Sequence, residues 1–167
     1  AAGRFEDAET VLRELINFFG DSPLLPEAYT ELAEVLDDRG RRDEAVQLAT
    51  QAAVRFKDDP RVLRHTADML RRAGEFRAAA DMYEQAESAG ASDAAVLLAA
   101  AQANESAGRT YDALGQYERL LALYPGSPQT IEANIASASI LYRQGQTSEA
   151  LRRLENLALT AQDQPHQ

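Results

Sequence analysis

The sequence predicts an all-α fold, a series of antiparallel helix pairs with about nine helices in total. Apolar residues recur at helical spacing in paired segments. Five glycines, spaced 37, 34, 34 and 37 residues apart, are each followed five residues later by an alanine: Gly3/Ala8, Gly40/Ala45, Gly74/Ala79, Gly108/Ala113 and Gly145/Ala150. A period near 34 that keeps its phase indicates stacked repeats, each of which buries its apolar face against a neighbour.

The apolar spacing places the helices at 5–19, 25–38, 42–56, 60–72, 76–89, 93–107, 110–123, 128–144 and 147–161. Each repeat glycine is expected just past the first helix of its pair, where a positive φ satisfies the last carbonyls. The short turn that follows makes the second helix antiparallel to the first. Asp59-Pro60, Asp93, Ser22-Pro23 and Ser127-Pro128 have the chemistry of helix starts.

Small residues are expected where the two helices of a pair cross. Alanines stand seven residues before the later repeat glycines, at Ala33, Ala67, Ala101 and Ala138. Together with the alanines that follow the glycines, they allow the helix axes to approach closely. Larger side chains at these positions are therefore expected to overpack the crossing.

The repeated pattern resembles the tetratricopeptide repeat over residues 3–161. The glycine and alanine are followed by a large residue four positions on: Leu12, Tyr83, Tyr117 and Leu154. The family's usual first-helix aromatic is present only as Tyr29, and its closing proline is clear only at Pro125. The resemblance implies a right-handed superhelical solenoid of helix pairs whose first helices line a concave groove.

The repeat phase predicts one domain at 1–161, followed by a polar tail at 162–167. Its parts are a half repeat at 1–22 and repeats at 23–59, 60–93, 94–127 and 128–161. The chain opens inside a helix pair, so we expect it to be a piece of a longer protein. The last helix retains an apolar surface, which predicts self-association or packing against a further repeat.

Composition excludes several classes of partner. A net charge of −10 disfavours nucleic acid, and there is no apolar run long enough for direct membrane insertion. The absence of cysteine and the 101-residue separation of His65 and His166 argue against a metal site, and no cofactor is expected. Lys57 is the only lysine among 17 basic residues, and with abundant alanine this indicates a GC-rich bacterial genome.

Two links between helices are longer than the family standard. Phe19-Gly20-Asp21-Ser22-Pro23 and Tyr124-Pro125-Gly126-Ser127-Pro128 resemble each other and the links of bacterial envelope-associated tetratricopeptide proteins. That resemblance favours a periplasmic or envelope location. The interpretation that we prefer for the two links is a structural loop where the superhelix changes pitch.

We expect no enzyme, because no phosphate-binding loop, paired histidine or nucleophile pattern occurs. By the family resemblance, the groove would present the following partner-binding residues: Thr30, Glu34, Asp37, Arg61, Arg64, Asp68, Arg71, Leu98, Gln102, Glu105, Ile135, Ser139 and Tyr142. Some family members clamp a terminal carboxylate with Lys and Asn. Thr30 and Glu34 occupy the corresponding positions, so that clamp is absent.

Arg61, Arg64, Asp68 and Arg71 fall on one helical face at spacings of 0, 3, 7 and 10. The arginines could bind a partner's carboxylates, since guanidinium groups recognise them bidentately. Alternatively, they pair internally with Asp68 and with acids of adjoining repeats, Glu34, Asp37, Asp38 and Glu105. His65 is expected to be a surface residue.

The predicted function is a non-catalytic scaffold that binds a protein or peptide in its groove, with arginine anchors at one end and apolar contacts at the other. One alternative is a structural spacer with an empty groove, in a bacterial envelope or exopolysaccharide-export assembly. A second alternative is an accessory repeat region of a larger enzyme.

Overall fold

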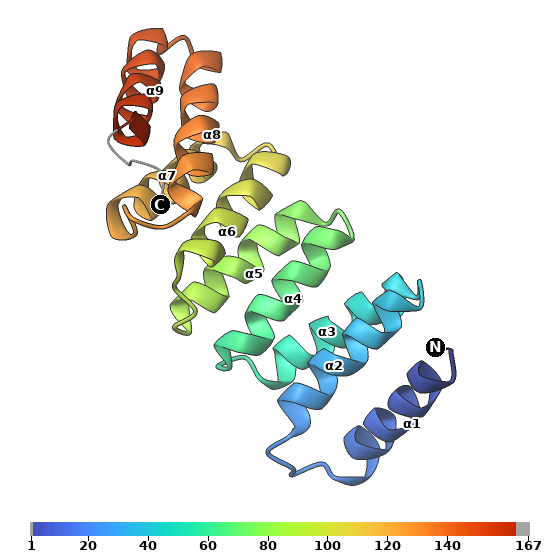
Figure 1. Cartoon of the computed structure of the whole chain (residues 1–167). Coiled ribbons are helices and arrows are strands. Elements are labelled where there is room, and N and C mark those ends of the chain that lie inside the picture. The colour runs from blue at the N-terminus through green and yellow to red at the C-terminus, as the bar shows by residue number, and fades with distance from the viewer. Residues whose placement is uncertain (1, 163–167) are drawn as a thin grey trace. The chain divides into compact units, whose positions relative to one another are not determined.

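The computed structural model describes residues 2–162, and the side chains of residues 6–159. Nine helices and no strand occur in that part of the chain (Figure 1). Their bounds are α1 Ala2–Phe18, α2 Leu25–Asp38, α3 Arg42–Arg55, α4 Pro60–Arg72, α5 Phe76–Ser88, α6 Ala94–Ser106, α7 Thr110–Leu123, α8 Gln129–Arg143 and α9 Thr147–Gln162. The predicted all-α class of paired helices is confirmed.

Glycines in the left-handed region end the first helix of each of the four complete pairs. Gly40, Gly74, Gly108 and Gly145 have φ angles of 76°, 82°, 75° and 81°. Their amide groups donate to carbonyls in the last turn of the helix, as in Gly74 N to Arg71 O at 3.1 Å. The prediction was wrong for Gly3, which lies inside α1 instead of between two helices.

Two of the four predicted helix starts are confirmed. The Asp59 side chain accepts a hydrogen bond from Arg61 N, and the Asp93 side chain accepts one from Val96 N. The prediction was wrong for the two serines, because α2 begins at Leu25 and α8 at Gln129. Ser22 instead accepts from Leu24 N within the link, and the Ser127 hydroxyl is buried without a hydrogen-bond partner among the described residues.

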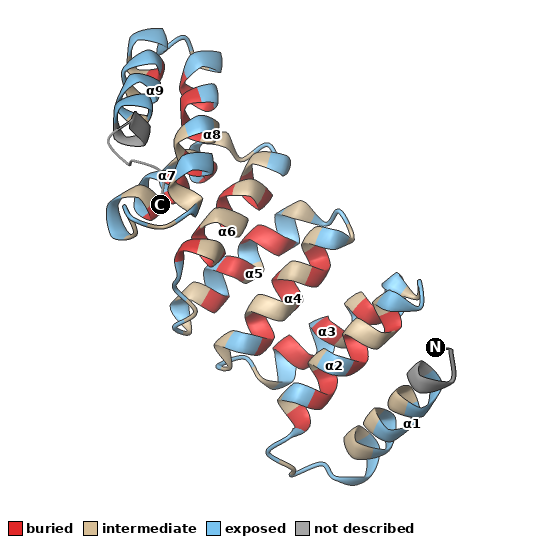
Figure 2. Cartoon of the chain, viewed as in Figure 1, coloured by how far each residue is buried: buried red, intermediate tan, exposed pale blue. Residues whose placement is uncertain are grey.

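The chain divides into two compact units, residues 1–91 and residues 92–167. In unit 1, α2 packs on α3 and α4 packs on α5, while α1 packs on α2 and α3 on α4. In unit 2, α6 packs on α7 and α8 on α9, with α7 against α8. Buried residues lie where these helices meet (Figure 2). The second helices α3 and α7 therefore each pack against their own pair and against the next one.

The predicted alanine crossings are confirmed by their burial. Ala33, Ala67, Ala101 and Ala138 are at most 2% exposed, and Ala45, Ala79, Ala113 and Ala150 at most 4%. Larger side chains fill the space around them: Leu32, Leu36 and Met69 in unit 1, and Leu97, Tyr117 and Ile140 in unit 2. This packing fixes each first helix against its partner and leaves its outer face to solvent.

Candidate functional site

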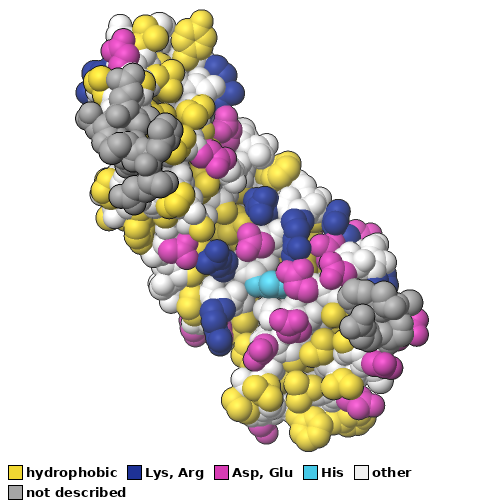
Figure 3. All heavy atoms as spheres, in the orientation of Figure 1, with side chains coloured by type: hydrophobic (Ala, Val, Ile, Leu, Met, Phe, Trp, Pro, Cys, Tyr) yellow, Lys and Arg dark blue, Asp and Glu magenta, His cyan; other side chains and the backbone are white. Residues whose placement is uncertain are grey.

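The first helices of unit 1, α2 and α4, are joined by a network of ionic contacts. The same carboxylate oxygen of Glu34 accepts from Arg72, at 2.7 Å, and from Nε2 of His65, at 3.0 Å. Asp37 accepts from Arg42 Nε at 2.7 Å and lies 3.5 Å from Arg72. Acidic and basic side chains gather around this histidine in Figure 3. Arg72 therefore brings the predicted residues Glu34 and Asp37 together. Arg72 itself is not one of the predicted partner-binding residues.

The prediction of a surface histidine was wrong for His65. Its side chain is 17% exposed, and its Nδ1 atom is buried without a hydrogen-bond partner among the described residues. Burial lowers the pKa of His65 below its usual value, although the neighbouring Glu34 carboxylate acts in the opposite direction. For Glu34, burial raises the pKa, but Arg72 and His65 outweigh it and the pKa is lowered.

The arginines of α4 are engaged within the chain. Arg61 lies 3.1 Å from Asp59, the residue that caps its own helix. Nε of Arg71 donates to the Tyr83 hydroxyl at 3.3 Å, and that hydroxyl in turn donates to Asp68. Arg64 also interacts within the chain. These contacts favour internal pairing of the arginines on this helical face. Arg61 is the most accessible of them, because its side chain is 82% exposed.

The first helices of unit 2, α6 and α8, present a different surface. Gln102 donates to Glu132 at 2.6 Å, and Arg143 donates to Glu105 at 2.6 Å. Leu98 is half-buried against the core, whereas Ile135 and Tyr142 are 53% and 66% exposed. The structure therefore brings the predicted residues of unit 2 together on two adjacent helices. The Thr30 hydroxyl, in unit 1, donates to Glu27 O of its own helix.

Two tyrosines contribute to these surfaces in a way that the sequence analysis missed. Tyr83 and Tyr117, both 1% exposed, come from second helices, and the repeat pattern predicts them only as large packing residues. Their hydroxyls reach carboxylates of the first helices, Asp68 and Glu105. Burial, together with these carboxylates, raises the pKa of both tyrosines. The sequence signal for these contacts is the hydroxyl group itself. Tyr83 and Tyr117 stand at a position that is leucine in α1 and α9.

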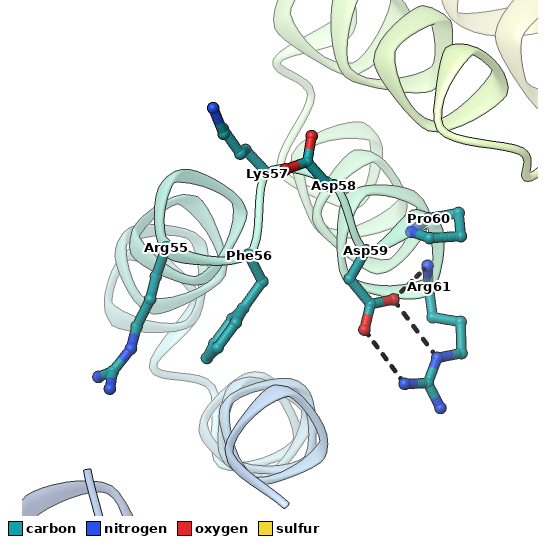
Figure 4. A pocket seen from close by; sticks show the side chains of 7 residues that line it. All are labelled: Arg55, Phe56, Lys57, Asp58, Asp59, Pro60 and Arg61. Carbon is teal, nitrogen blue, oxygen red and sulfur yellow. Dashed lines mark hydrogen bonds and ion pairs between the residues drawn. The ribbon is translucent and has the colours of Figure 1, made fainter. Parts of the chain in front are cut away.

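A shallow hollow of about 520 Å³ lies at the link between α3 and α4 (Figure 4). Phe56 lines one side, and the Asp59–Arg61 pair lines the other. The Arg55 guanidinium lies 5.5 Å from the Phe56 ring centroid and donates to Gly20 O. Its interactions are therefore made within the chain. Among the described residues, no group of three His, Asp or Glu side chains is placed to hold a metal ion. None of the helices described is both long and apolar enough to span a bilayer.

Stacked pairs of antiparallel helices, with positive-φ glycines and alanine crossings, define a helical-repeat protein. The sequence model of the tetratricopeptide repeat matches residues 6–165. The chain belongs to the tetratricopeptide repeat family, as the sequence pattern predicted. This family mediates protein–protein interaction, and its members are typically non-catalytic scaffolds. No curated protein matches the chain.

Solved structures of other proteins share this fold. A MamA protein is 18% identical, with a TM-score of 0.75, and the match covers 92% of this chain and 81% of that one. A tetratricopeptide repeat protein from Parabacteroides merdae ATCC 43184 is 18% identical, with a TM-score of 0.76 and coverage of 96% and 61%. A putative kinesin light chain with nearly identical repeats, from Podosopora anserina, is 20% identical, with a TM-score of 0.73 and coverage of 99% and 91%. At these identities the likeness concerns the fold.

Proposed function

We propose that this chain is a scaffold that binds a protein partner on the exposed faces of its first helices. The observation that carries the proposal is the exposure of Ile135 and Tyr142 on α8, beside the half-buried Leu98 of α6. Large apolar side chains on a helix face that is not needed for the core are typical of an interaction surface. Charged groups around them would orient the partner.

The two units offer different chemistry to such a partner. The surface of α2 and α4 in unit 1 is charged, and that of α6 and α8 in unit 2 carries apolar residues between two polar bridges. We assign the electrostatic contacts to Arg61, Arg64 and Arg71, and the apolar contacts to Leu98, Ile135 and Tyr142. An arginine that leaves its internal partner to bind another carboxylate exchanges one ion pair for another, so the net gain is small. The apolar residues therefore supply most of the affinity.

A structural spacer is the second candidate, and one observation favours it. Arg61, Arg71 and Arg72 are all paired with acids or a tyrosine of their own unit. A surface whose charges satisfy one another holds α2 and α4 in place without needing a partner. Under this alternative Arg72 is a brace between successive helix pairs, and the contacts of Arg61 and Arg71 stabilise their own pair.

A binding assay with three variants of the intact chain separates the candidates. Arg64→Glu combined with Arg71→Glu reverses charge in unit 1, and Ile135→Asp places a charge in the apolar surface of unit 2. Arg77→Glu, at an exposed position of α5, is the control for a charge reversal outside the two proposed surfaces. A scaffold loses partner recovery in at least one of the two surface variants and keeps it in the control. Equal recovery of every partner by all three variants would contradict the proposal.

A further inference from the structure

One face of α8 carries three exposed apolar side chains in a row. Ile131, Ile135 and Tyr142 are 57%, 53% and 66% exposed. At 100° per residue, positions 0, 4 and 11 lie within about 40° of one another, and they extend about 16 Å along the helix. We call these three residues the α8 stripe. A second face of α8 is already buried, through residues such as Ala133 and Ile140, so the stripe is additional to what the core requires.

The first helices of unit 1, α2 and α4, show that the repeat fold does not require this stripe. The positions equivalent to Ile135 are Thr30 in α2 and Arg64 in α4, counted from the repeat glycine. Those equivalent to Tyr142 are Asp37 and Arg71. Unit 1 therefore builds the same helix pairs with polar residues at these places. Exposed apolar area costs free energy in water, and nothing in the helix pairing of unit 2 requires it.

The charges around the stripe are asymmetric along α8. Glu105 is neutralised by Arg143 near the Tyr142 end of the helix. Glu132, beside Ile131, accepts a hydrogen bond from Gln102 but forms no ion pair with any described residue. The end of the stripe near Ile131 is therefore negative and the other end is balanced. A partner that covers the apolar residues would bring its own charge next to Glu132, where a cation is favoured.

From this we infer that the α8 stripe binds an amphipathic helix that carries a lysine or arginine next to its apolar edge, at the end lying over Glu132. An apolar edge that recurs every three to four residues matches the spacing of the stripe. Ser139 is small and exposed between Ile135 and Tyr142 in the sequence, so it permits close approach there. The net charge of −10 on the chain also favours a positively charged partner over longer distances. The inference rests on the proposed function and names the partner class for unit 2.

Two synthetic amphipathic peptides test the inference on the whole chain. They share a leucine edge and differ only in having lysine or glutamate along its border. Calorimetric titration should show that the lysine peptide binds the wild type about tenfold more tightly than the glutamate peptide, or better. Ile135→Ser and Tyr142→Ser should each weaken the lysine peptide about tenfold, because each removes apolar contact area. Glu132→Gln should reduce the preference for lysine over glutamate.

Val54→Ser is the matched control, since Val54 is 76% exposed on α3 of unit 1. It should leave both affinities unchanged, and circular dichroism melts should show that all variants are folded. Equal binding of the two peptides, no binding of either, or full affinity in Ile135→Ser and Tyr142→Ser would each overturn the inference. The proposed function would survive that result if the binding assay still lost its partner in the Arg64→Glu/Arg71→Glu variant.

Discussion

His65 illustrates how one partly buried side chain links two helix pairs. It donates from α4 to Glu34 of α2, and Arg72 donates to the same oxygen. Burial is the largest influence on the pKa of the imidazole and lowers it, as does the charge of Arg72. Glu34 and Asp68 raise the pKa, but the net shift is downward. At the scale of single residues, protonation of this ring therefore acts against folding, because burial disfavours its charged form.

The stability of the chain should depend on pH through His65. In the unfolded chain the pKa of this histidine is near 6.5, and in the folded chain it is lower. The unfolded state therefore binds the proton first, and the free energy of unfolding should decrease as the pH falls from about 7 through this value. Urea denaturation between pH 5 and pH 7 should show a shallower decrease for His65→Gln. The same slope in both proteins would contradict this assignment.

Asn104 is a second residue whose burial has a measurable consequence. It is 0% exposed in α6, and neither atom of its side-chain amide bonds to a described residue. The equivalent positions, four residues before the repeat glycine, are Leu36, Leu70 and Leu141. Asn104→Leu should raise the free energy of unfolding by about 1 kcal/mol, because it removes an unsatisfied buried amide. Thermal denaturation measures this, and a lower melting temperature would mean that leucine does not fit here.

At the scale of the helices, the pairs depend on the small residues at their crossings. Ala79 of α5 is 0% exposed, and its neighbour Ala78 lies on the exposed side of the same helix. The glycine turn before α5 determines which side of that helix meets α4. Both alanines have the same intrinsic helix propensity, so they separate the effect of packing from that of helix formation.

Ala79→Leu should lower the free energy of unfolding by about 1 to 3 kcal/mol, because the larger side chain overpacks the crossing. Ala78→Leu should change it by less than about 0.5 kcal/mol, as expected for a surface substitution. Chemical denaturation followed by circular dichroism compares the two. If the two variants are equally stable, close packing at Ala79 does not determine the pairing of α4 with α5.

At the scale of the whole molecule, α9 differs from the other second helices. Leu154 is 41% exposed, whereas the equivalent residues Ala49, Tyr83 and Tyr117 are each 1% exposed. Leu151 and Leu159 of α9 are also exposed, at 54% and 59%. These exposed leucines lie outside the face that α9 buries against α8. The apolar surface that they form is a candidate for contact between copies of the chain.

Self-association through α9 should appear in light scattering as an average mass that rises with protein concentration. Leu154→Glu should reduce that rise, because it places a charge in the contact. Val54→Glu introduces the same charge at another exposed apolar position and should leave the rise unchanged. A single-chain mass for the wild type at every concentration would contradict the prediction.

Helix positions, the glycine turns and the alanine crossings were predictable because they depend on local spacing. A helix face is defined by residues three and four apart, and a glycine turn by the residues next to it. The prediction was wrong for the helix caps at Ser22 and Ser127. Both serines belong to the links and lie before the helices that they were expected to cap. The partner-binding role of the residues on the candidate surfaces stays a prediction, which follows from the way a repeat places equivalent positions on equivalent faces.

Pairing between side chains depended instead on the tertiary structure. Which acid meets which arginine is set by the packing of one helix pair on the next, over separations such as 38 residues between Glu34 and Arg72. The reach of Tyr83 and Tyr117 to carboxylates, and the burial of His65 and Asn104, arise in the same way. Periodicity thus determined the fold class and the exposed faces of this protein. Three-dimensional packing decided which of their charges are already satisfied and which apolar residues remain open to a partner.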